Sequence, residues 1–490
     1  MSTSEERFDV IVVGGGGAGL AAAIEARKLG RSVLLIEKNA AFGGSTAWSV
    51  GSVTASQTPH QRRRGIDDTP EDHWRDMAGF NGSLDNRDNP ALRRVLADAM
   101  PQTFQWLLDQ GIRFYGPMPE PPHQKPRMHN VLPNSRAFIT YLEHAARRAG
   151  VEIRCETRAV DLVSESGRVI GIDCETAGSL RRYHAGAVVL ASGDFTNDPE
   201  FKAQYMGPQE AKVEGVNTGA TGDGQRLALR LGARIVNGDL ALGPELRFVP
   251  PQRRNMLLML PPWRPLANFM AWSLDHMPSA LLRPFVMSFV STALAPSPDL
   301  FKHGAILVNR EGKRFVDETN RPAYAVPDQP GKVGYILLDD RIAQLFSAWP
   351  NFISTAPGVA YAYVTDYRRN RPDVFTRADG LGALARKLGM PADTLRATVD
   401  EYNATAGFRP MLGAGPYVAL GPVRAVFVHA EGGLAVDHEH RVLGAQDQPI
   451  PGLYAAGSTG QGGLLLKGHG HHLAWAFASG RRAGRNAARL

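Results

Sequence analysis

The sequence predicts an α/β protein in which one parallel sheet is assembled from both ends of the chain. Residues 8–13 and 32–36 are short β-branched runs of the kind buried in parallel sheets, and the helix-forming, alanine-rich residues 20–26 lie between them. A further apolar run at residues 187–190 ends in a tight turn, and residues 451–455 bring back a strand of the same kind near the C-terminus. The long middle segment is therefore predicted to be an insertion into the first domain.

The composition is that of a soluble globular protein with two or three domains. Of the 490 residues, 43% are hydrophobic and 21% are charged, and the net charge is +7. The only tight cluster of positive charge is Arg62, Arg63 and Arg64, which we interpret as a solvated loop because no nucleic-acid-binding module or interleaved aromatic pattern accompanies it. We therefore expect no nucleic-acid partner.

Cysteine usage and hydropathy exclude several further classes. Cys155 and Cys174 are the only cysteines, too few for an iron–sulfur cluster or a disulfide framework. The segment before the first apolar run is polar and acidic, so we expect no signal peptide, and no uncharged apolar run is long enough for a membrane span. The expected location is the cytoplasm.

A glycine-rich turn joins the first predicted strand to the first helix. Residues 14–19 read Gly-Gly-Gly-Gly-Ala-Gly, and their G-x-G-x-x-G spacing is that of dinucleotide-binding loops. Gly14 permits the tight turn, Gly16 lets the backbone approach a pyrophosphate, and Gly19 lets helix and strand pack closely. The second strand ends at Glu37, where a carboxylate accepts hydrogen bonds from ribose hydroxyls. Together these features predict a bound dinucleotide with its phosphates at the helix N-terminus.

Later segments favour FAD as that dinucleotide. Gly43-Gly44-Ser45-Thr46 follows closely after Glu37, and such small residues would let a flexible loop lie against an isoalloxazine ring. Residues 187–194 and 451–458 each carry a buried strand into a tight turn of the nucleotide fold. Because the chain holds one complete G-x-G-x-x-G, we do not expect a separate NAD(P)H domain.

These segments resemble the fumarate reductase and succinate dehydrogenase flavoprotein family, including its 3-ketosteroid dehydrogenase branch. The resemblance is carried by residues 14–23, 43–46, 219–224, 306–318, 398–403 and 452–457. It implies a Rossmann-like FAD-binding domain with an inserted α+β capping domain, and a substrate bound between cap and flavin. We place the FAD-binding domain at residues 1–245 and 425–490 and the capping domain at residues 246–424.

The residues expected to hold FAD come from the glycine turn and from the later segments. They are Gly14, Gly16, Gly17, Ala18, Gly19, Glu37, Lys38, Gly43, Gly44, Ser45, Thr46, Gly51, Ala191, Ser192, Gly193, Asp223, Gly457, Ser458, His472 and Leu473. Relatives of the complex-II type carry FAD covalently on a histidine. Residues 45–48 contain no histidine, so FAD is expected to bind non-covalently.

A histidine cluster opens the last predicted helix. Gly468-His469-Gly470-His471-His472 precedes a helix from Leu473 to about Arg489, whose N-terminal amides would face the pyrimidine edge of the flavin. The resemblance puts the backbone of His472 and Leu473 at that edge. The histidines could instead bind a metal ion, but no carboxylate or cysteine partners them locally, so we predict no metal.

The resemblance also supplies candidates for proton transfer. Arg321 corresponds to the fumarate reductase arginine that shuttles the proton, with one residue fewer between it and Glu318. Tyr324 corresponds to the tyrosine that follows the same acid in the ketosteroid branch. The alternatives are a salt-bridged scaffold arginine and a core tyrosine.

Two further candidates would contact the carbonyl end of the substrate. His429 precedes a double glycine, as the family's histidine at the substrate carbonyl does, and an imidazole there can donate to a developing enolate oxygen; the alternative is a histidine that caps a turn. Lys467 corresponds to the arginine that clamps a substrate carboxylate, without the bidentate fork. The resemblance also puts Val249 where the family has a histidine that binds the second carboxylate of the substrate. We therefore expect a pocket less polar than a dicarboxylate site.

The predicted cap contains an apolar insertion at residues 251–300, rich in Met, Leu, Phe, Trp and Pro. One interpretation is a mouth that admits a hydrophobic substrate or a quinone from a membrane surface, with peripheral contact at the inner face of the membrane. The other is ordinary cap core plus an oligomer contact. We favour the second interpretation.

The predicted function is desaturation or reduction of a C–C bond adjacent to a carbonyl by an FAD-dependent oxidoreductase. The expected substrate is an apolar cyclic ketone, such as a ketosteroid, or a monocarboxylate. Alternatives are a flavin oxidase or an alcohol or amine dehydrogenase with His429 as base, a dicarboxylate enzyme, and a non-catalytic flavin-binding scaffold. With no iron–sulfur or haem site on the chain, an external electron donor or acceptor is expected.

Overall fold

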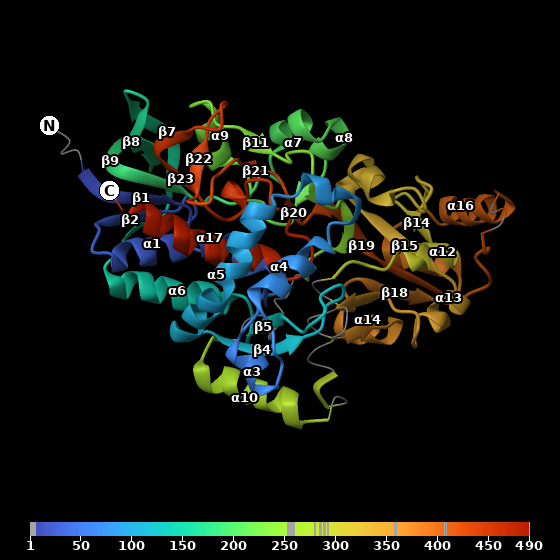
Figure 1. Cartoon of the computed structure of the whole chain (residues 1–490). Helices are drawn as coiled ribbons and strands as arrows, with labels where there is room; N and C mark the ends of the chain where they lie inside the picture. Colours follow the sequence, from blue (N-terminus) through green and yellow to red (C-terminus); the bar gives the residue numbers. More distant parts are fainter. Residues whose placement is uncertain are drawn as a thin grey trace.

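The chain folds around two large sheets, each with its own hydrophobic core (Figure 1). We describe it from a computed structural model, which covers residues 6–251, 260–278, 281–283, 287, 291, 294–356, 360–405, 407 and 409–489.

The first sheet has eight strands and is built from both ends of the chain, as the sequence predicts. The strands run in the order β22-β23-β9-β1-β2-β6, with β8 attached to β9 and β7 to β8. Their bounds are β1 Glu6–Val13, β2 Val33–Ile36, β6 Glu152–Arg154, β7 Thr157–Glu165, β8 Arg168–Thr176, β9 Ser179–Leu190, β22 Arg441–Leu443 and β23 Pro449–Ala455. Because β1 is parallel to β2 and β9, and β23 is parallel to β9, their carboxyl ends meet at one edge. That edge is where ligands bind in doubly wound sheets.

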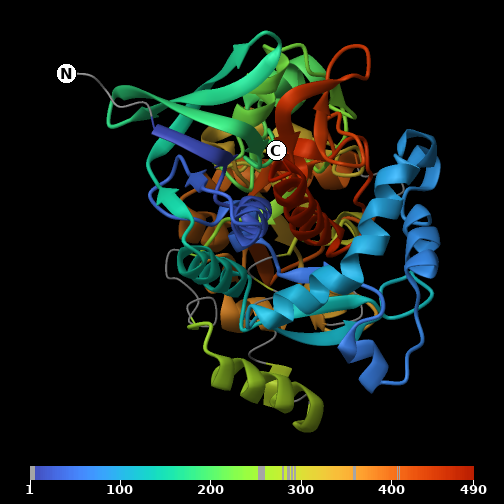
Figure 2. The ribbon, with the colours of Figure 1, turned by 60° about the vertical axis from the view of Figure 1, so that its left-hand side comes forward.

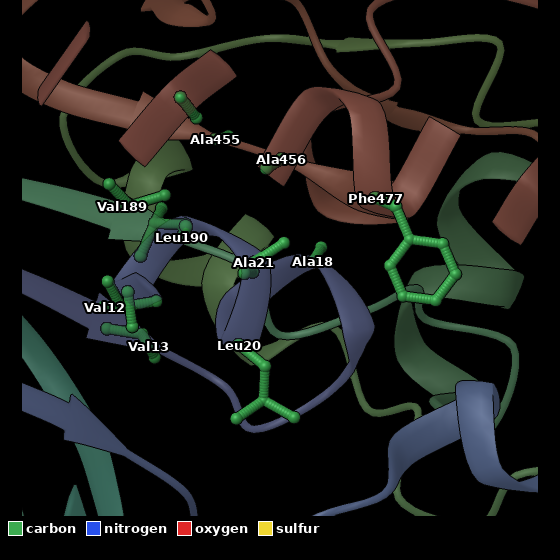
Figure 3. Packing of buried hydrophobic residues seen from close by; sticks show 14 of the residues in the cluster. Val12, Val13, Ala18, Leu20, Ala21, Val189, Leu190, Ala455, Ala456 and Phe477 are labelled. Atoms are coloured by element: carbon green, nitrogen blue, oxygen red, sulfur yellow. The ribbon is translucent and has the colours of Figure 1, made fainter. Parts of the chain in front are cut away.

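Helices from distant parts of the chain pack around this sheet. α1 (Gly17–Lys28) lies against α17 (His471–Ala487) and α6 (Arg136–Ala149), and α5 (Pro90–Asp109) packs on α17 (Figure 2). Gly480 and Gly484 allow the close approach of α17, because a Cβ at these positions would lie 2.3 and 2.2 Å from carbonyl oxygens of α1. Figure 3 shows the strand ends of β1 and β9, the start of α1 and Phe477 of α17 around one apolar cluster.

The second sheet has six strands and forms the core of the predicted cap. Its order is β10-β19-β15-β14, and β13 and β18 also pair with β19. The bounds are β10 Glu214–Gly215, β13 Glu245–Phe248, β14 Ile306–Val308, β15 Gly334–Leu338, β18 Phe375–Ala378 and β19 Tyr417–Phe427. β10 and the end of β19 come from residues assigned above to the FAD-binding domain, so the two units share chain segments at their junction. The domain limits stay a prediction.

Short elements complete both units. Around the second sheet are α12 Asp299–Lys302, α13 Asp340–Leu345, α14 Val364–Asn370, α15 Leu381–Leu388 and α16 Ala392–Thr405, with the 3₁₀ turns η3 Pro322–Asp328 and η4 Pro330–Lys332. Small sheets are formed by β3 Ser52–Thr54, β4 Arg113–Met118 and β5 Met128–Leu132, by β11 Ile235–Val236 with β21 Gly433–Leu434, by β12 Ala241–Leu242 with β20 His429–Ala430, and by β16 Ser354–Ala356 with β17 Ala360–Ala362. The remaining short helices are α2 Gly44–Trp48, α3 Pro59–Arg63, α4 Pro70–Ala78, α7 Pro199–Tyr205, α8 Pro208–Ala211 and α9 Asp223–Leu229, with the 3₁₀ turns η1 Gly82–Arg87 and η5 Gly457–Gly460.

Two local predictions from the sequence are wrong. Arg62 and Arg63 lie in the short helix α3 rather than in a loop, because the Thr58 side chain caps its N-terminus and Pro59 occupies its first position. The segment expected to be a flexible loop after Gly43 forms the single-turn helix α2.

The apolar insertion is described only in part. α10 (Arg264–His276) packs on β4 and β5, and Trp263, Phe269 and Trp272 each expose more than half of their surface. The predictions for residues 252–259, and for most of 284–290, lie outside the described residues. None of the helices described is long and apolar enough to cross a membrane.

Candidate active site

The glycine turn sits where β1 meets α1, and its backbone is shaped for a ligand. A Cβ on Gly14 would lie 2.5 Å from the Ala191 carbonyl oxygen, and one on Gly19 would lie 1.8 Å from the Gly14 carbonyl oxygen, so both glycines serve the fold. Gly16 differs, because the nearest atom to its Cβ position is the Thr46 hydroxyl at 4.0 Å. The surface over Gly16 is thus open enough for a pyrophosphate to approach the backbone.

The amides of the first turn of α1 lie beside this surface. Leu20 makes the first helical hydrogen bond, to the Gly16 carbonyl, so the preceding amides need acceptors from outside the helix. The Gly17 N–H donates to the Thr46 hydroxyl at 3.1 Å, which ties α2 to this turn. The amides and the helix dipole together suit an anionic ligand.

Glu37 ends β2 as predicted and is 7% exposed. One carboxylate oxygen accepts from the Gly15 N–H at 2.7 Å, and the other accepts from the backbone and side chain of Asn39 at 2.9 and 2.6 Å. These bonds fix the carboxylate beside the glycine turn, where the resemblance puts the ribose.

Other predicted cofactor residues connect segments around the same edge. Ser192 accepts from the Gly224 N–H at 3.0 Å, and the Gly193 carbonyl accepts from Thr459 at 2.9 Å. A Cβ at Gly457 would lie 2.9 Å from the Ala18 side chain. The structure therefore brings the end of β9, the turn after β23 and the start of α1 together.

Lys38, Asp223, Ser45 and Gly51 have partners within the protein. Lys38 is paired with Asp223 at 2.8 Å and donates to the Gly219 carbonyl at 2.8 Å, which holds the turn before α9. Ser45 accepts from Asn217 at 2.9 Å. Gly51, with φ +86, precedes β3, and its carbonyl accepts from the Val131 N–H at 3.0 Å. These contacts give the four residues a structural role at this edge of the sheet.

The N-terminus of α17 meets the strand β20 in a group of three polar side chains. His472 Nε2 and His429 Nε2 lie 3.3 and 3.4 Å from the same carboxylate oxygen of Glu431, and the two imidazole centroids are 3.6 Å apart. The other oxygen of Glu431 accepts from Gln461 at 2.6 Å and from the Leu466 N–H at 3.1 Å. We call His429, Glu431 and His472 the carboxylate–imidazole group.

The charges of this group are arranged around one buried carboxylate. Burial alone would raise the pKa of Glu431, but the charge of His472 and the hydrogen bonds from both histidines hold that pKa well below its usual value. Burial, and then the charge of His429, lower the pKa of His472. The imidazole side chains are each 20% exposed, whereas the Glu431 side chain is 4% exposed. A fixed anion therefore lies behind two accessible imidazoles.

The carboxylates in this region overturn the reason given for predicting no metal. Glu431 contacts His472, and Glu120 accepts from the ring of His469 at 2.5 Å, although both acids are distant in sequence from the histidine cluster. The donor set of His429, Glu431 and His472 could itself hold a cation.

Lys467 lies beside the carboxylate–imidazole group through the backbone. The preceding amide, of Leu466, donates to Glu431, and the Lys467 carbonyl accepts from His471. Among the residues described, no acceptor is paired with the Lys467 ammonium group. That ammonium group is therefore available to an anionic ligand.

Arg321 and Tyr324 form a pair on the cap. The Arg321 guanidinium lies 3.9 Å from the centroid of the Tyr324 ring and donates to its hydroxyl. Burial, and then the charge of Glu210 in α8, raise the pKa of Tyr324. Arg321 has φ +48, a strained conformation for a non-glycine residue. In the described part of the chain, no hydrogen bond or ion pair joins this pair to the carboxylate–imidazole group.

Three residues near the site were not proposed as site residues from the sequence. Glu431 was visible in the motif His-Ala-Glu-Gly-Gly, but its partner His472 is far along the chain. Arg247 lies on the non-core face of β13, opposite to the buried Leu246 and Phe248, and its charge acts on His469. Leu242 is paired in register with His429 and is 48% exposed.

The residues present fit FAD. The open surface over Gly16, the amides of α1, the fixed carboxylate of Glu37 and the N-terminus of α17 all lie around the carboxyl edge of one sheet. The first two groups suit a pyrophosphate, Glu37 suits a ribose, and the N-terminus of α17 suits the pyrimidine edge of a flavin ring, which gains negative charge on reduction.

Comparisons with known proteins agree with this assignment. A family model described as "FAD binding domain" matches residues 9–257 and 277–465. An NADH:fumarate oxidoreductase of Klebsiella pneumoniae is 26% identical over 92% of this chain, which spans 44% of that protein. A fumarate reductase (cytochrome) of Shewanella frigidimarina is 28% identical and is covered to 78%, with all of this chain aligned. A vinyl phenol reductase of Lactiplantibacillus plantarum is 27% identical, with 99% of this chain and 97% of that protein aligned.

Solved structures share the fold over nearly the whole chain. A flavocytochrome c3 fumarate reductase in an open conformation superposes with a TM-score of 0.75 at 24% identity, covering 100% of this chain and 79% of that one. A 3-ketosteroid Δ1-dehydrogenase of Sterolibacterium denitrificans superposes with a TM-score of 0.66 at 20% identity, covering 99% of both chains. The predicted fold, an FAD-binding domain with an inserted cap, is thereby confirmed. The chain belongs to the fumarate reductase and succinate dehydrogenase flavoprotein family of FAD-dependent oxidoreductases.

Proposed function

We propose that this protein reduces, or in reverse forms, a C=C bond conjugated to a carbonyl group. The observation that carries the proposal is the carboxylate–imidazole group at the N-terminus of α17. Bound FAD would supply hydride transfer. The protein would bind the carbonyl, orient the double bond and exchange a proton.

Glu431 accepts from Nε2 of both rings, so a ring of this group can donate to a carbonyl oxygen through Nδ1 only while it carries a second proton. We propose that His429 binds the carbonyl oxygen in this way, with Glu431 as its counter-ion. Negative charge develops on this oxygen as the β-carbon receives hydride, and preorganised N–H donors stabilise such charge strongly. Glu431 keeps both imidazoles oriented, because its remaining lone pairs are occupied by Gln461 and Leu466. Glu431 is a positioning residue in this scheme.

The proton at the adjacent carbon would pass through the Arg321–Tyr324 pair. The guanidinium and the phenol contact each other directly, so a proton given up by one can be replaced through the other. Closure of the cap would bring this pair to the substrate. Enzymes of this kind commonly exclude water by such closure.

The substrate we favour is an enone or an unsaturated monocarboxylate. Leu242 presents an exposed apolar side chain directly across from His429. Val249 follows β13 and packs against the core of the second sheet, so it adds no polar group here. Lys467, whose ammonium group is paired with no acceptor among the residues described, provides a single cation for a substrate carboxylate rather than a bidentate clamp. Of the relatives above, one is a fumarate reductase and another is a vinyl phenol reductase. The substrates in their names range from a charged dicarboxylate to a largely apolar phenol.

We further propose that FAD is bound non-covalently and that electrons come from an external donor. Residues 45–48 offer no histidine for a covalent link. Exposed Trp263, Phe269 and Trp272 on α10 are compatible with contact at the inner membrane surface, although we favour an oligomer contact and a cytoplasmic location.

The proposal is tested by reoxidation of the reduced flavin without oxygen. Dithionite-reduced protein is mixed in a stopped-flow instrument with 2-cyclohexenone, a steroid 4-en-3-one, crotonate or fumarate. We expect rapid return of the flavin absorbance with at least one of the first three, and slower return with fumarate. If none of the four reoxidises the flavin, and saturated alcohols or amines instead produce hydrogen peroxide, the protein is an oxidase and the proposal is wrong.

Variants separate the two parts of the scheme. Arg321→Ala and Tyr324→Phe should slow flavin reoxidation about 100-fold and about 10-fold, the range for loss of general acid catalysis. His303→Gln, whose ring contacts Phe346 and neither Arg321 nor Tyr324 among the described contacts, is a control that should change nothing. Wild-type rates in both Arg321→Ala and Tyr324→Phe would remove this pair from the proton path.

A further inference from the structure

A second group of histidines lies behind the candidate active site and is fully buried. His73 of α4, His123 of the β4–β5 connection and His471, the first residue of α17, each offer a ring nitrogen within 4.8 Å of the other two. The exposed fractions of the three residues are 0%, 7% and 0%. Phe80 closes one side, with its ring centroid 4.8 Å from that of His123 and 5.2 Å from that of His471.

The hydrogen bonds of two of these rings can be assigned from their partners. The Lys467 carbonyl can only accept, so His471 Nδ1 carries a proton and His471 Nε2 has a free lone pair. Arg127 can only donate to His123 Nδ1, at 2.9 Å, so the proton of a neutral His123 is on Nε2 and points to His471 Nε2 at 3.2 Å.

His73 is left without a partner. Neither of its ring nitrogens has a hydrogen bond among the described residues, although the residue is completely buried. A buried polar group without a hydrogen bond is destabilising, so this ring calls for a ligand.

The geometry points to a metal ion. We propose that His73, His123 and His471 bind one divalent transition-metal ion, with zinc as the best fit. Zinc–imidazole bonds of about 2.0–2.1 Å in a tetrahedral site put two ligand nitrogens about 3.3 Å apart. The 3.2 Å between His123 Nε2 and His471 Nε2, a hydrogen bond in the absence of the ion, is close to that separation, so an ion would need little movement of the two rings.

The surroundings supply the supporting contacts of such a site. The Lys467 carbonyl already orients His471 so that its Nε2 lone pair faces the cluster. When His123 coordinates through Nε2, its proton moves to Nδ1, so the Arg127 guanidinium has to release this nitrogen and keep Asp76 as its acceptor. Asp76 Oδ2, now 4.0 Å from His123 Nδ1, is the acceptor that a small shift of the ring would bring into hydrogen-bond range. No proton is lost in this exchange, because all three ligands bind as neutral imidazoles.

The nearby charges favour a dication. Arg127 is buried and paired with Asp68 at 2.7 Å and with Asp76 at 2.5 Å. Glu120 also acts electrostatically on His471, and one of its oxygens is buried without a hydrogen bond in the described structure. Even if His469, which is hydrogen-bonded to Glu120, is counted as a cation, three carboxylates outweigh two cations beside the imidazoles.

The inferred role is structural. The ion would fasten His471, the first residue of α17, to His73 of α4 and to His123 of the β4–β5 connection. These two histidines lie 398 and 348 residues earlier in the chain. His472 follows directly, so the same ion would hold the carboxylate–imidazole group in place.

Metal content of the FAD-containing protein tests the proposal. Wild-type protein is stripped with dipicolinate, loaded separately with Zn²⁺ and with Co²⁺, desalted and analysed by mass spectrometry of the elements. We expect about one ion per chain, a tetrahedral Co²⁺ spectrum beyond the flavin bands, and a melting temperature raised by a few degrees through binding to the folded state alone.

Two sets of variants locate the ion. His73→Gln and His123→Gln should lose at least about nine-tenths of the bound metal, whereas His429→Gln, in the other histidine group, should keep it. Flavin content and the flavin spectrum show whether each variant is folded. The proposal is overturned if wild-type protein takes up no ion, if folded His73→Gln keeps a full equivalent, or if the ion is lost only with His429→Gln.

Discussion

The position of the pyrophosphate can be tested by Gly16→Ala. Gly16 has φ −82 and ψ −176, which any residue adopts, and the new methyl group would meet no protein atom closer than 4.0 Å. The free protein should therefore fold normally. The methyl group would, however, occupy the surface through which phosphate oxygens reach the first amides of α1. Loss of one or two hydrogen bonds to a charged group, at about 1.5–3 kcal/mol each, corresponds to an affinity for FAD lower by roughly 100-fold.

The assay compares FAD affinity and folding separately. Apoprotein prepared by acid ammonium sulfate is titrated with FAD, flavin fluorescence gives Kd, and the melting temperature reports the fold. Gly380→Ala is the matched control, because its backbone is extended and no atom lies within 4 Å of the added carbon. Gly19→Ala should instead damage the fold, since its Cβ would lie 1.8 Å from the Gly14 carbonyl oxygen. Wild-type affinity for FAD in Gly16→Ala would refute this position for the pyrophosphate.

Three further predictions concern the catalytic group and stability. Glu431→Gln should retain FAD but slow flavin reoxidation by an enone about 100-fold, because the anion that orients both imidazoles is lost; an unchanged rate in stopped-flow would exclude that role. Lys467→Ala should raise KM for crotonate about 10-fold and leave KM for 2-cyclohexenone nearly constant, and equal effects on both would show that the lysine does not bind carboxylate. Burial lowers the pKa of His60 to about 4 and those of His129 and His440 to about 3, so below pH 6.5 the unfolded chain binds protons that the folded chain does not. The free energy of unfolding from urea titrations should therefore fall by about 3 kcal/mol between pH 6.5 and pH 5.5, at about 1 kcal/mol per group because the unfolded histidines are half protonated at pH 6.5, and a flat profile would contradict the burial of these rings.

The dinucleotide-binding unit could be predicted because its signals are local. The run from β1 through the glycine turn to α1 and Glu37 is continuous in sequence, and each residue acts on a neighbour within one β-α-β unit. The return strand β23 was also visible, since a buried parallel strand has a short β-branched or apolar pattern wherever it occurs.

Short helices were harder to predict for a physical reason. A single turn has little intrinsic stability, so α2 depends on the contact of Thr46 with Gly17, and α3 depends on its Thr58 cap. The candidates Arg321 and Tyr324 could be named from resemblance, but their direct stacking followed only from the turn before η3.

The sequence by itself determined the FAD-binding topology and the residue types of the site. Only the tertiary structure decided which histidines act together: Glu431 lies between His429 and His472, and His471 turns away to meet His73 and His123. Adjacent residues at the start of a helix point in different directions, so His471 and His472 join different groups. Their partners come from segments far away in the chain, and a carboxylate or imidazole has no local pattern that records such a contact.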